Sequence, residues 1–172
     1  MLTKNFYSYM KAALQKTSAT FTKPDGTTKM TGLSTNYIPM PPLSVMNSWG
    51  STVNKHGVSF GTGTTPADVS NYCLESILDD TQISVTVPSG VSFSRGDTFD
   101  EYSVSFGVTN KTAEAIIISE VGLTAIPYNS GSSNEVVYVL VDRTVLDTPI
   151  TIPAGQSKQI TYTIRFNYGD AV

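Results

Sequence analysis

The sequence predicts a mainly β protein, an antiparallel β-sandwich preceded by a short N-terminal helix and an extended irregular N-terminal region. Three observations predict this class. Apolar and polar side chains alternate in several runs of the second half. Clusters of Gly, Pro, Ser, Asn and Asp separate these runs, and no apolar pattern of helical length follows residue 80.

Three runs alternate with period two, which places one face of a strand on a core and the other face in solvent or on a partner. Their apolar positions are Ile83, Val85 and Val87, then Tyr102, Val104, Phe106 and Val108, and last Ile160, Tyr162, Ile164 and Phe166.

Two further runs, 115–121 and 136–141, are apolar on both faces, which is typical of central strands or of strands covered on both sides. Turn residues separate the runs at 88–90, 94–97, 129–134 and 153–155. Short strands with such punctuation favour an immunoglobulin-like or jelly-roll-like sandwich.

Residues 1–16 are expected to form a short amphipathic helix. Thr3 is its candidate cap, and the expected apolar stripe consists of Leu2, Phe6, Met10 and either Ala13 or Leu14. Because an isolated helix of this length is marginal in water, it must dock on its own domain or on a neighbouring subunit.

Residues 17–70 are rich in turn formers and show no clear period. Pro24-Asp25-Gly26 predicts a tight turn, and Pro39-Met40-Pro41-Pro42 predicts an extended stretch without ladder hydrogen bonds. Either this region contains strands that the pattern does not resolve, or it is an arm that lies along another subunit. We therefore divide the chain into an N-terminal helix and arm, 1–56, and a β-sandwich domain, 57–172.

Composition excludes several classes of function. Of 172 residues only 15% are charged, against roughly 25% in ordinary soluble domains. The net charge is −3, without the basic stripe of a nucleic-acid-binding protein. No run of apolar residues is long enough to span a membrane, and the N-terminus lacks the apolar core of a signal peptide. We expect a protein made in a cytoplasm, with neither nucleic acid nor membrane as a partner.

Residues with catalytic or zinc-binding potential are few. Cys73 is the single cysteine and His56 the single histidine, so an internal disulfide is excluded and ligands for zinc are too few. Cys73 lies in a segment that Thr65 and Pro66 are expected to open as a short helix, and there it resembles a small buried hydrophobe. His56 is expected at the surface of a loop.

The remaining candidates favour structural roles. The acidic pairs Asp79-Asp80 and Asp97 with Asp100-Glu101 lack the spacing of a calcium loop and are expected to be solvated turns. Gly61-Thr62-Gly63-Thr64-Thr65-Pro66 lacks the Lys-Ser/Thr ending of a phosphate-binding loop and predicts a tight connection. Trp49 is either an anchor in a core or interface, or a platform for a sugar. We therefore assign no catalytic, cofactor-binding or metal-binding residue, and expect a protein that is not an enzyme.

Two segments resemble those of small structural proteins from tailed-bacteriophage particles. The first is Val58-Ser59-Phe60-Gly61-Thr62-Gly63-Thr64-Thr65-Pro66-Ala67-Asp68, followed by Tyr72-Cys73-Leu74-Glu75. The second runs from Val141 to Gln156 and on through Ile160-Thr161-Tyr162-Thr163-Ile164-Arg165-Phe166, and resembles a closing β-hairpin. One departure is Asn71, where the pattern often has Asp before Tyr.

This resemblance implies a virion protein made in the host bacterial cytoplasm, with other virion proteins as partners. The leading hypothesis is a tail or head–tail connector subunit that forms a homo-oligomeric ring or tube. The alternatives are a capsid decoration or head-fibre attachment protein, and a receptor- or glycan-binding module at the tail tip.

Overall fold

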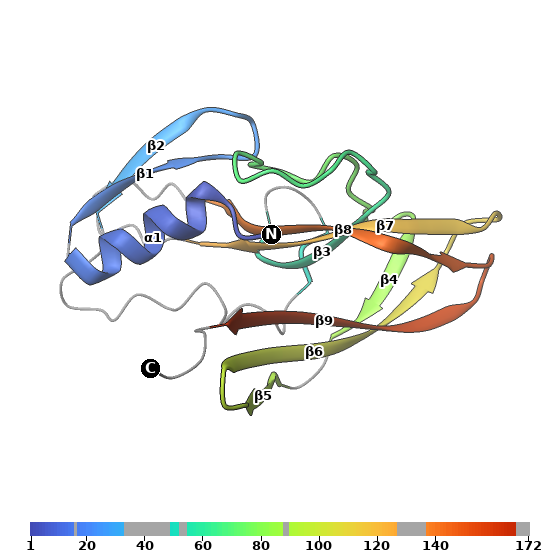
Figure 1. Cartoon of the computed structure of the whole chain (residues 1–172). Helices are drawn as coiled ribbons and strands as arrows, with labels where there is room; N and C mark the ends of the chain where they lie inside the picture. The colour runs from blue at the N-terminus through green and yellow to red at the C-terminus, as the bar shows by residue number, and fades with distance from the viewer. Residues whose placement is uncertain (16, 33–48, 52–54, 88–89, 127–136, 168–172) are drawn as a thin grey trace.

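The structure, a computed structural model, describes residues 1–15, 17–32, 49–51, 55–87, 90–126 and 137–167 (Figure 1). Its elements are one helix, α1 (Lys4–Gln15), and the strands β1 (Ser18–Thr22), β2 (Thr28–Gly32), β3 (Gly57–Gly61), β4 (Ile83–Thr86), β5 (Ser92–Arg95), β6 (Phe99–Asn110), β7 (Ile116–Ala125), β8 (Val139–Ile152) and β9 (Ser157–Asn167).

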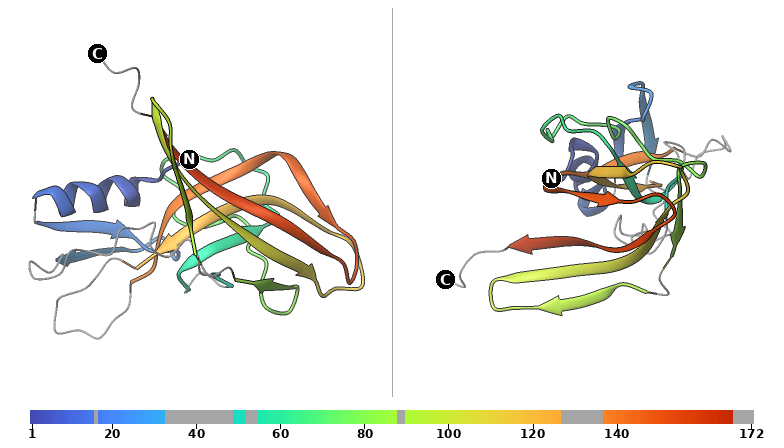
Figure 2. Two further views of the ribbon diagram at one scale, coloured as in Figure 1. Left: turned by 90° about the horizontal axis from the view of Figure 1, so that it is seen from below. Right: turned by 90° about the vertical axis from the view of Figure 1, so that its right-hand side faces the viewer.

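Two antiparallel sheets form the body of the protein, and each is named here after its central strand. The β7 sheet has the order β3-β7-β8. In the β6 sheet, β9 pairs along one side of β6, whereas β4 and β5 follow each other along the opposite side. The sheets lie one above the other (Figure 2), and the rings of Phe60 and Phe106 meet between them at 5.8 Å. The predicted mainly β class with a short N-terminal helix is thus confirmed.

The three alternating runs behave as predicted along most of their length. In β6 and β9 the even-numbered positions from Val104 to Val108 and from Ile160 to Ile164 are buried, while Tyr102 and Phe166 are half-buried. The run at β4 is shorter than expected, since Val87 follows the strand and is 45% exposed.

The connection from β8 to β9 corrects the predicted closing hairpin. β9 does not pair back onto β8: it pairs with β6 in the other sheet, while β8 pairs with β7. Residues 153–156 therefore cross from one sheet to the other. On the two sides of this crossing, Ile152 of β8 and Ile160 of β9 are both buried in the core, where they are 0% and 4% exposed.

Asn110, at the end of β6, ties the β8–β9 connection to the neighbouring connection that leads from β6 to β7. Its amide nitrogen donates to the carbonyls of Glu114 and Ile152, and its amide oxygen accepts from Thr112. Its backbone NH donates to Gln156. One buried side chain thus satisfies the backbone of both crossings.

Helix α1 docks on its own chain, through the residues that precede it as well as through its own face. Thr3 occupies the expected cap position, but its hydroxyl donates to the carbonyl of Leu140 in β8. The predicted stripe was wrong in part: Phe6 is buried, whereas Met10 is 39% and Leu14 79% exposed. The buried positions of the helix are Asn5, Phe6, Tyr9 and Ala12.

The region 17–70 contains strands that the pattern did not resolve. β1 and β2 form a hairpin around the predicted turn, in which Gly26 has a φ of 80° and its NH bonds to Lys23. β3 begins at Gly57, the predicted start of the sandwich. The predicted extended stretch at 39–42 lies outside the described residues.

The helix expected after Thr65 is absent, because local side chains satisfy the backbone in another way. The carboxylate of Asp68 accepts from the NH of Ser70, and the amide oxygen of Asn71 accepts from the NH of Asp68. The irregular segment 62–78 instead lies over the face of the β7 sheet that is turned away from the β6 sheet (Figure 1).

This cover explains the runs that are apolar on both faces. β7 is the central strand of its sheet and is buried at every position except Ile117. β8 is an edge strand and matches the second alternative, a strand covered on both sides, over residues 139–143, which are all buried. No helix in the described part of the chain has the length and apolar character needed to cross a membrane.

Candidate interaction surface

The strongest convergence of charged groups in the described residues is a buried ion pair between β7 and β8. Nε of Arg143 donates to Oε2 of Glu120 at 2.8 Å, and the two side chains are 2% and 0% exposed. Both lie on the covered face of the β7 sheet, beneath segment 62–78. Glu120 also accepts from the backbone NH groups of Gly63, Glu75 and Ser76.

Glycines at 61 and 63 make room for this carboxylate. A Cβ at Gly61 would stand 2.5 Å from Oε1 of Glu120, and one at Gly63 would stand 2.6 Å from the same atom. The glycine-rich segment therefore does wrap an anion, but the anion is a side chain of the same protein. The segment was expected to be a tight connection that leads into a short helix, but no helix follows it. The physical reason for its glycines is Glu120, which no local motif signals.

The remaining groups around Arg143 close the cluster. Nη1 donates to Oδ1 of Asn71 at 3.0 Å, and Nη2 lies 3.6 Å from Oε2 of Glu75. Glu75 in turn accepts from the backbone and hydroxyl of Thr65, which lower the pKa of its carboxyl group. The cluster thus sets one guanidinium against two carboxylates, and Nη2 of Arg143 is buried without a hydrogen-bond partner among the described residues. Its contacts fasten segment 62–78 to the sheet.

Among the described residues, neither Cys73 nor His56 lies with the groups that a catalytic or zinc site would need. Cys73 is half-buried, and burial, with the charge of Glu120, raises the pKa of its thiol. A raised pKa opposes formation of the reactive thiolate. His56 is exposed beside the start of β3, as expected.

The two acidic pairs form turns and surface ion pairs. Asp79 accepts from the hydroxyl and the NH of Thr81, and these bonds lower the pKa of its carboxyl group. Asp80 lies 3.4 Å from the ammonium of Lys55. The described residues contain no group of three or more His, Cys, Asp or Glu side chains that could hold a metal ion.

The second acidic cluster is divided between the two faces of the β6 sheet. Asp100 receives two bonds from Arg95, and Glu101 receives two from Arg165. Asp97 is exposed in the turn between β5 and β6. Arg165 also lies over the ring of Phe99, with its guanidinium 4.2 Å from the ring centroid.

Trp49 is half-buried and packs against the core, next to β3. Its indole NH is buried without a hydrogen-bond partner among the described residues. Packing of the ring against the core favours the role of an anchor.

The broad exposed surface of the described residues is the outer face of the β6 sheet, the face turned away from the β7 sheet. It carries small hydroxyl side chains in rows across the strands; the positions are Ser84, Thr86, Ser92, Ser94, Ser103, Ser105, Thr109, Ser157, Thr161 and Thr163. Hydroxyls bond across the strands, from Ser105 to Thr161 at 2.7 Å and from Thr109 to Ser157 at 2.6 Å.

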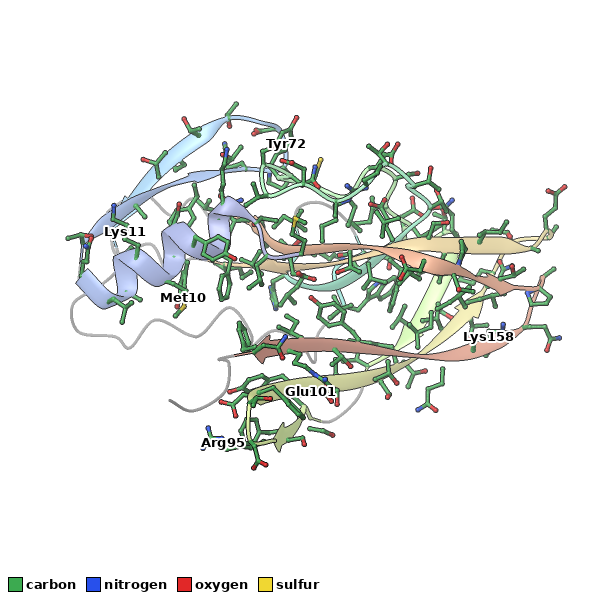
Figure 3. All side chains as sticks on the ribbon, in the orientation of Figure 1. Met10, Lys11, Tyr72, Arg95, Glu101 and Lys158 are labelled. Carbon is green, nitrogen blue, oxygen red and sulfur yellow. The ribbon has the colours of Figure 1, made fainter. Side chains whose placement is uncertain are left out.

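Charge is almost absent from this hydroxyl face. In the described part of the sheet only Glu101 and Arg165 are charged on this side, and they pair with each other at one end, where Figure 3 labels Glu101. Surfaces that remain in water usually carry about 25–35% charged residues of both signs. Sequence reasoning found the alternation but not this surface, because the pairing of β6 with β9 is what assembles its rows.

Comparisons with protein-family models, with curated proteins and with solved structures found no match to this chain.

Proposed function

We propose that this protein is a non-enzymatic structural subunit that works by packing its surface against other proteins. More particularly, it is a virion protein of a tailed bacteriophage, in the tail or at the head–tail connection. The observation that carries the first step is the hydroxyl face of the β6 sheet. A regular face of mostly small side chains, with a single ion pair at one end, is suited to close approach by another protein, because little charge must be stripped of water.

The role of the buried charged groups also supports the class of non-enzymatic structural proteins. The ion pair of Glu120 and Arg143 is used to hold segment 62–78 on the β7 sheet, so the most enzyme-like convergence in the described chain has a structural task. The particular protein rests on the resemblance of the segments 58–75 and 141–166 to phage virion proteins.

The test is the protein content of purified phage particles from the bacterium whose genome carries the gene. We expect the chain in the particles at a fixed copy number, measured by quantitative mass spectrometry. Its absence from intact particles would overturn the phage assignment. Turnover of a substrate by the purified protein would overturn the non-enzymatic class.

Deletion of the gene distinguishes a tail or connector subunit from a capsid decoration protein. Loss of a tail or connector subunit gives filled heads without tails, as seen by electron microscopy. Tailed particles with fragile heads would instead assign the protein to capsid decoration.

A further inference from the structure

The edge of β9 that faces away from β6, called here the outer edge of β9, is a long strand edge. β9 pairs with β6 from Ser157 to Asn167 without a register shift, and no other described segment pairs with its outer edge. The other edges differ. Gly50 and Ile77 meet β3, Leu2 meets β8, and β4 and β5 together make an interrupted edge.

The pattern of hydrogen bonds shows which groups lie on the outer edge. Asn110 and Gln156 stand opposite each other just beyond the ladder, and the NH of Asn110 donates to Gln156. On the other side of β6, the NH of Lys111 donates to Gln82 of the β4 side. Hydrogen-bonded pairs alternate along an antiparallel ladder, so even-numbered residues of β9 bond to β6. The NH and C=O groups of the odd-numbered residues, from 157 to 165, therefore point outward.

The outer edge has few of the devices that prevent strands from pairing. Residues 159–164, Gln-Ile-Thr-Tyr-Thr-Ile, contain no charge, Pro or Gly. The charges lie beyond them: Lys158 is at one end of β9, and Arg165, which pairs with Glu101, is at the other. Figure 3 labels Lys158 and Glu101 near these two ends. An unprotected edge of this length is a template for another strand.

We infer that the outer edge of β9 binds the same edge of a second copy of this chain, antiparallel and centred on Thr161. The two β6 sheets then form one continuous sheet, and the hydroxyl face doubles in width. The inference names a partner for the packing proposed above and rests on that proposal.

Self-complementarity is the reason for choosing a second copy. Centred on Thr161, the antiparallel pairing sets Thr161 against itself and Thr163 against Gln159, and every outward group from 157 to 165 finds a partner. Hydroxyls meet polar groups on the outer face, where cross-strand Thr pairs are favourable. Arg165 faces Ser157 and Lys158 faces Ile164, so no two cations stand opposite each other. A two-fold axis through Thr161 generates both halves of the contact.

The test uses Thr161→Pro in the full chain. Because the NH of Thr161 points outward, proline removes an edge donor without breaking the ladder to β6. The matched control is Thr161→Val, which keeps the NH and the branched side chain. Sedimentation velocity over a range of concentrations should show self-association of the wild type and of Thr161→Val, and a dissociation constant raised about tenfold or more in Thr161→Pro.

Amide hydrogen exchange of the wild type gives a second measurement that does not depend on a folded variant. The amides of Gln159, Thr161 and Thr163 should exchange quickly in dilute protein and become protected as concentration rises, while those of Ile160 and Tyr162 are protected throughout. A monomer at all concentrations, or association that Thr161→Pro leaves unchanged, overturns the inference. So does protection that arises only on mixing with another virion protein. None of these results bears on whether the protein is present in phage particles. The inference can therefore fail while the proposed function stands, and the two failures are distinguishable.

Discussion

Gly61 shows how one buried carboxylate dictates the residues around it. A methyl group there would stand 2.5 Å from both Oε1 of Glu120 and the carbonyl oxygen of Ser76. Neither atom can move easily, since Glu120 is held by Arg143 and Ser76 belongs to the backbone that donates to Glu120. Glycine at this position is therefore a requirement of packing.

We expect Gly61→Ala to lower the free energy of unfolding by about 1–3 kcal/mol, the usual cost of overpacking a filled site. The measurement is urea denaturation followed by circular dichroism. Gly90→Ala is the control, because a Cβ at Gly90 meets nothing within 4 Å. Equal effects of the two substitutions would contradict the packing role of Gly61.

Tyr162 joins the two sheets through a polar contact inside the core. Its hydroxyl donates to Oδ2 of Asp142 at 2.7 Å. Burial, and then the charge of Asp142, raise the pKa of Tyr162 well above its usual value of 10.0. The unfolded chain therefore loses this proton at lower pH than the folded protein does, so stability is present below pH 10 and falls as the pH rises above it.

We expect Tyr162→Phe to cost roughly 1.5–3 kcal/mol at pH 7, because Asp142 loses a buried donor. Phenylalanine cannot ionise, so the difference between wild type and variant should shrink above pH 10. Urea midpoints at pH 7 and pH 11 measure both effects. Tyr7→Phe, at an exposed ring, is the control. A difference that stays constant with pH would contradict the role of the Tyr162 hydroxyl.

At the scale of the element, α1 illustrates how a partner selects one face of a helix. The stripe predicted from the sequence runs through Phe6 and Met10, whereas the stripe that the structure buries contains Phe6, Tyr9 and Ala12. The ring of Phe6 stacks on Phe166 of β9 at a centroid distance of 6.1 Å. Tertiary contact, and not periodicity alone, decided between the stripes.

We expect Phe6→Ala to cost about 3–5 kcal/mol, as a large buried ring does. Leu14→Ser should change stability by no more than about 0.5 kcal/mol, because Leu14 is 79% exposed. Thermal denaturation of both variants measures the difference. A large loss with Leu14→Ser would restore the stripe expected from the sequence.

The connection between β8 and β9 shows that tertiary contacts also decide which strands become neighbours. Alternation placed Ile160, Tyr162 and Ile164 on one face of a strand, and this is confirmed. It cannot name the neighbour of that strand, since a hairpin and a crossing require the same pattern. Asn110 favours the crossing by bonding both connections between the sheets. One partner, Glu114, is only 4 residues away, but the other, Ile152, lies 42 residues further along the chain, where no local pattern signals it.

At the scale of the whole molecule, the N-terminal region and the two sheets share one core. Phe6 and Phe21 belong to the same buried cluster as Val58 of β3 and Phe106 of β6. The backbone of Thr3 also bonds to Val141 of β8. The division predicted at residues 56 and 57 therefore does not separate the buried side chains of the described chain.

We expect the chain to unfold in one cooperative transition, because segments that share a core lose their packing together. Trp49 is the sole tryptophan and lies near the predicted boundary, so its fluorescence reports on one region while far-UV circular dichroism reports on all. Coincident urea curves are the expected result. Two separated transitions would instead support an independent N-terminal unit.

Local sequence patterns were enough to predict the mainly β class, the inward faces of β6 and β9, the turn at Gly26 and the low content of charged residues. These follow from the chemistry of neighbouring residues, and a local pattern carries them. Three further features became visible only in the folded chain: Glu120 fills the glycine-rich segment, β9 joins β6, and hydroxyls from separate strands form one face. Each of these depends on residues distant along the chain that meet only when burial of the common core brings the sheets together.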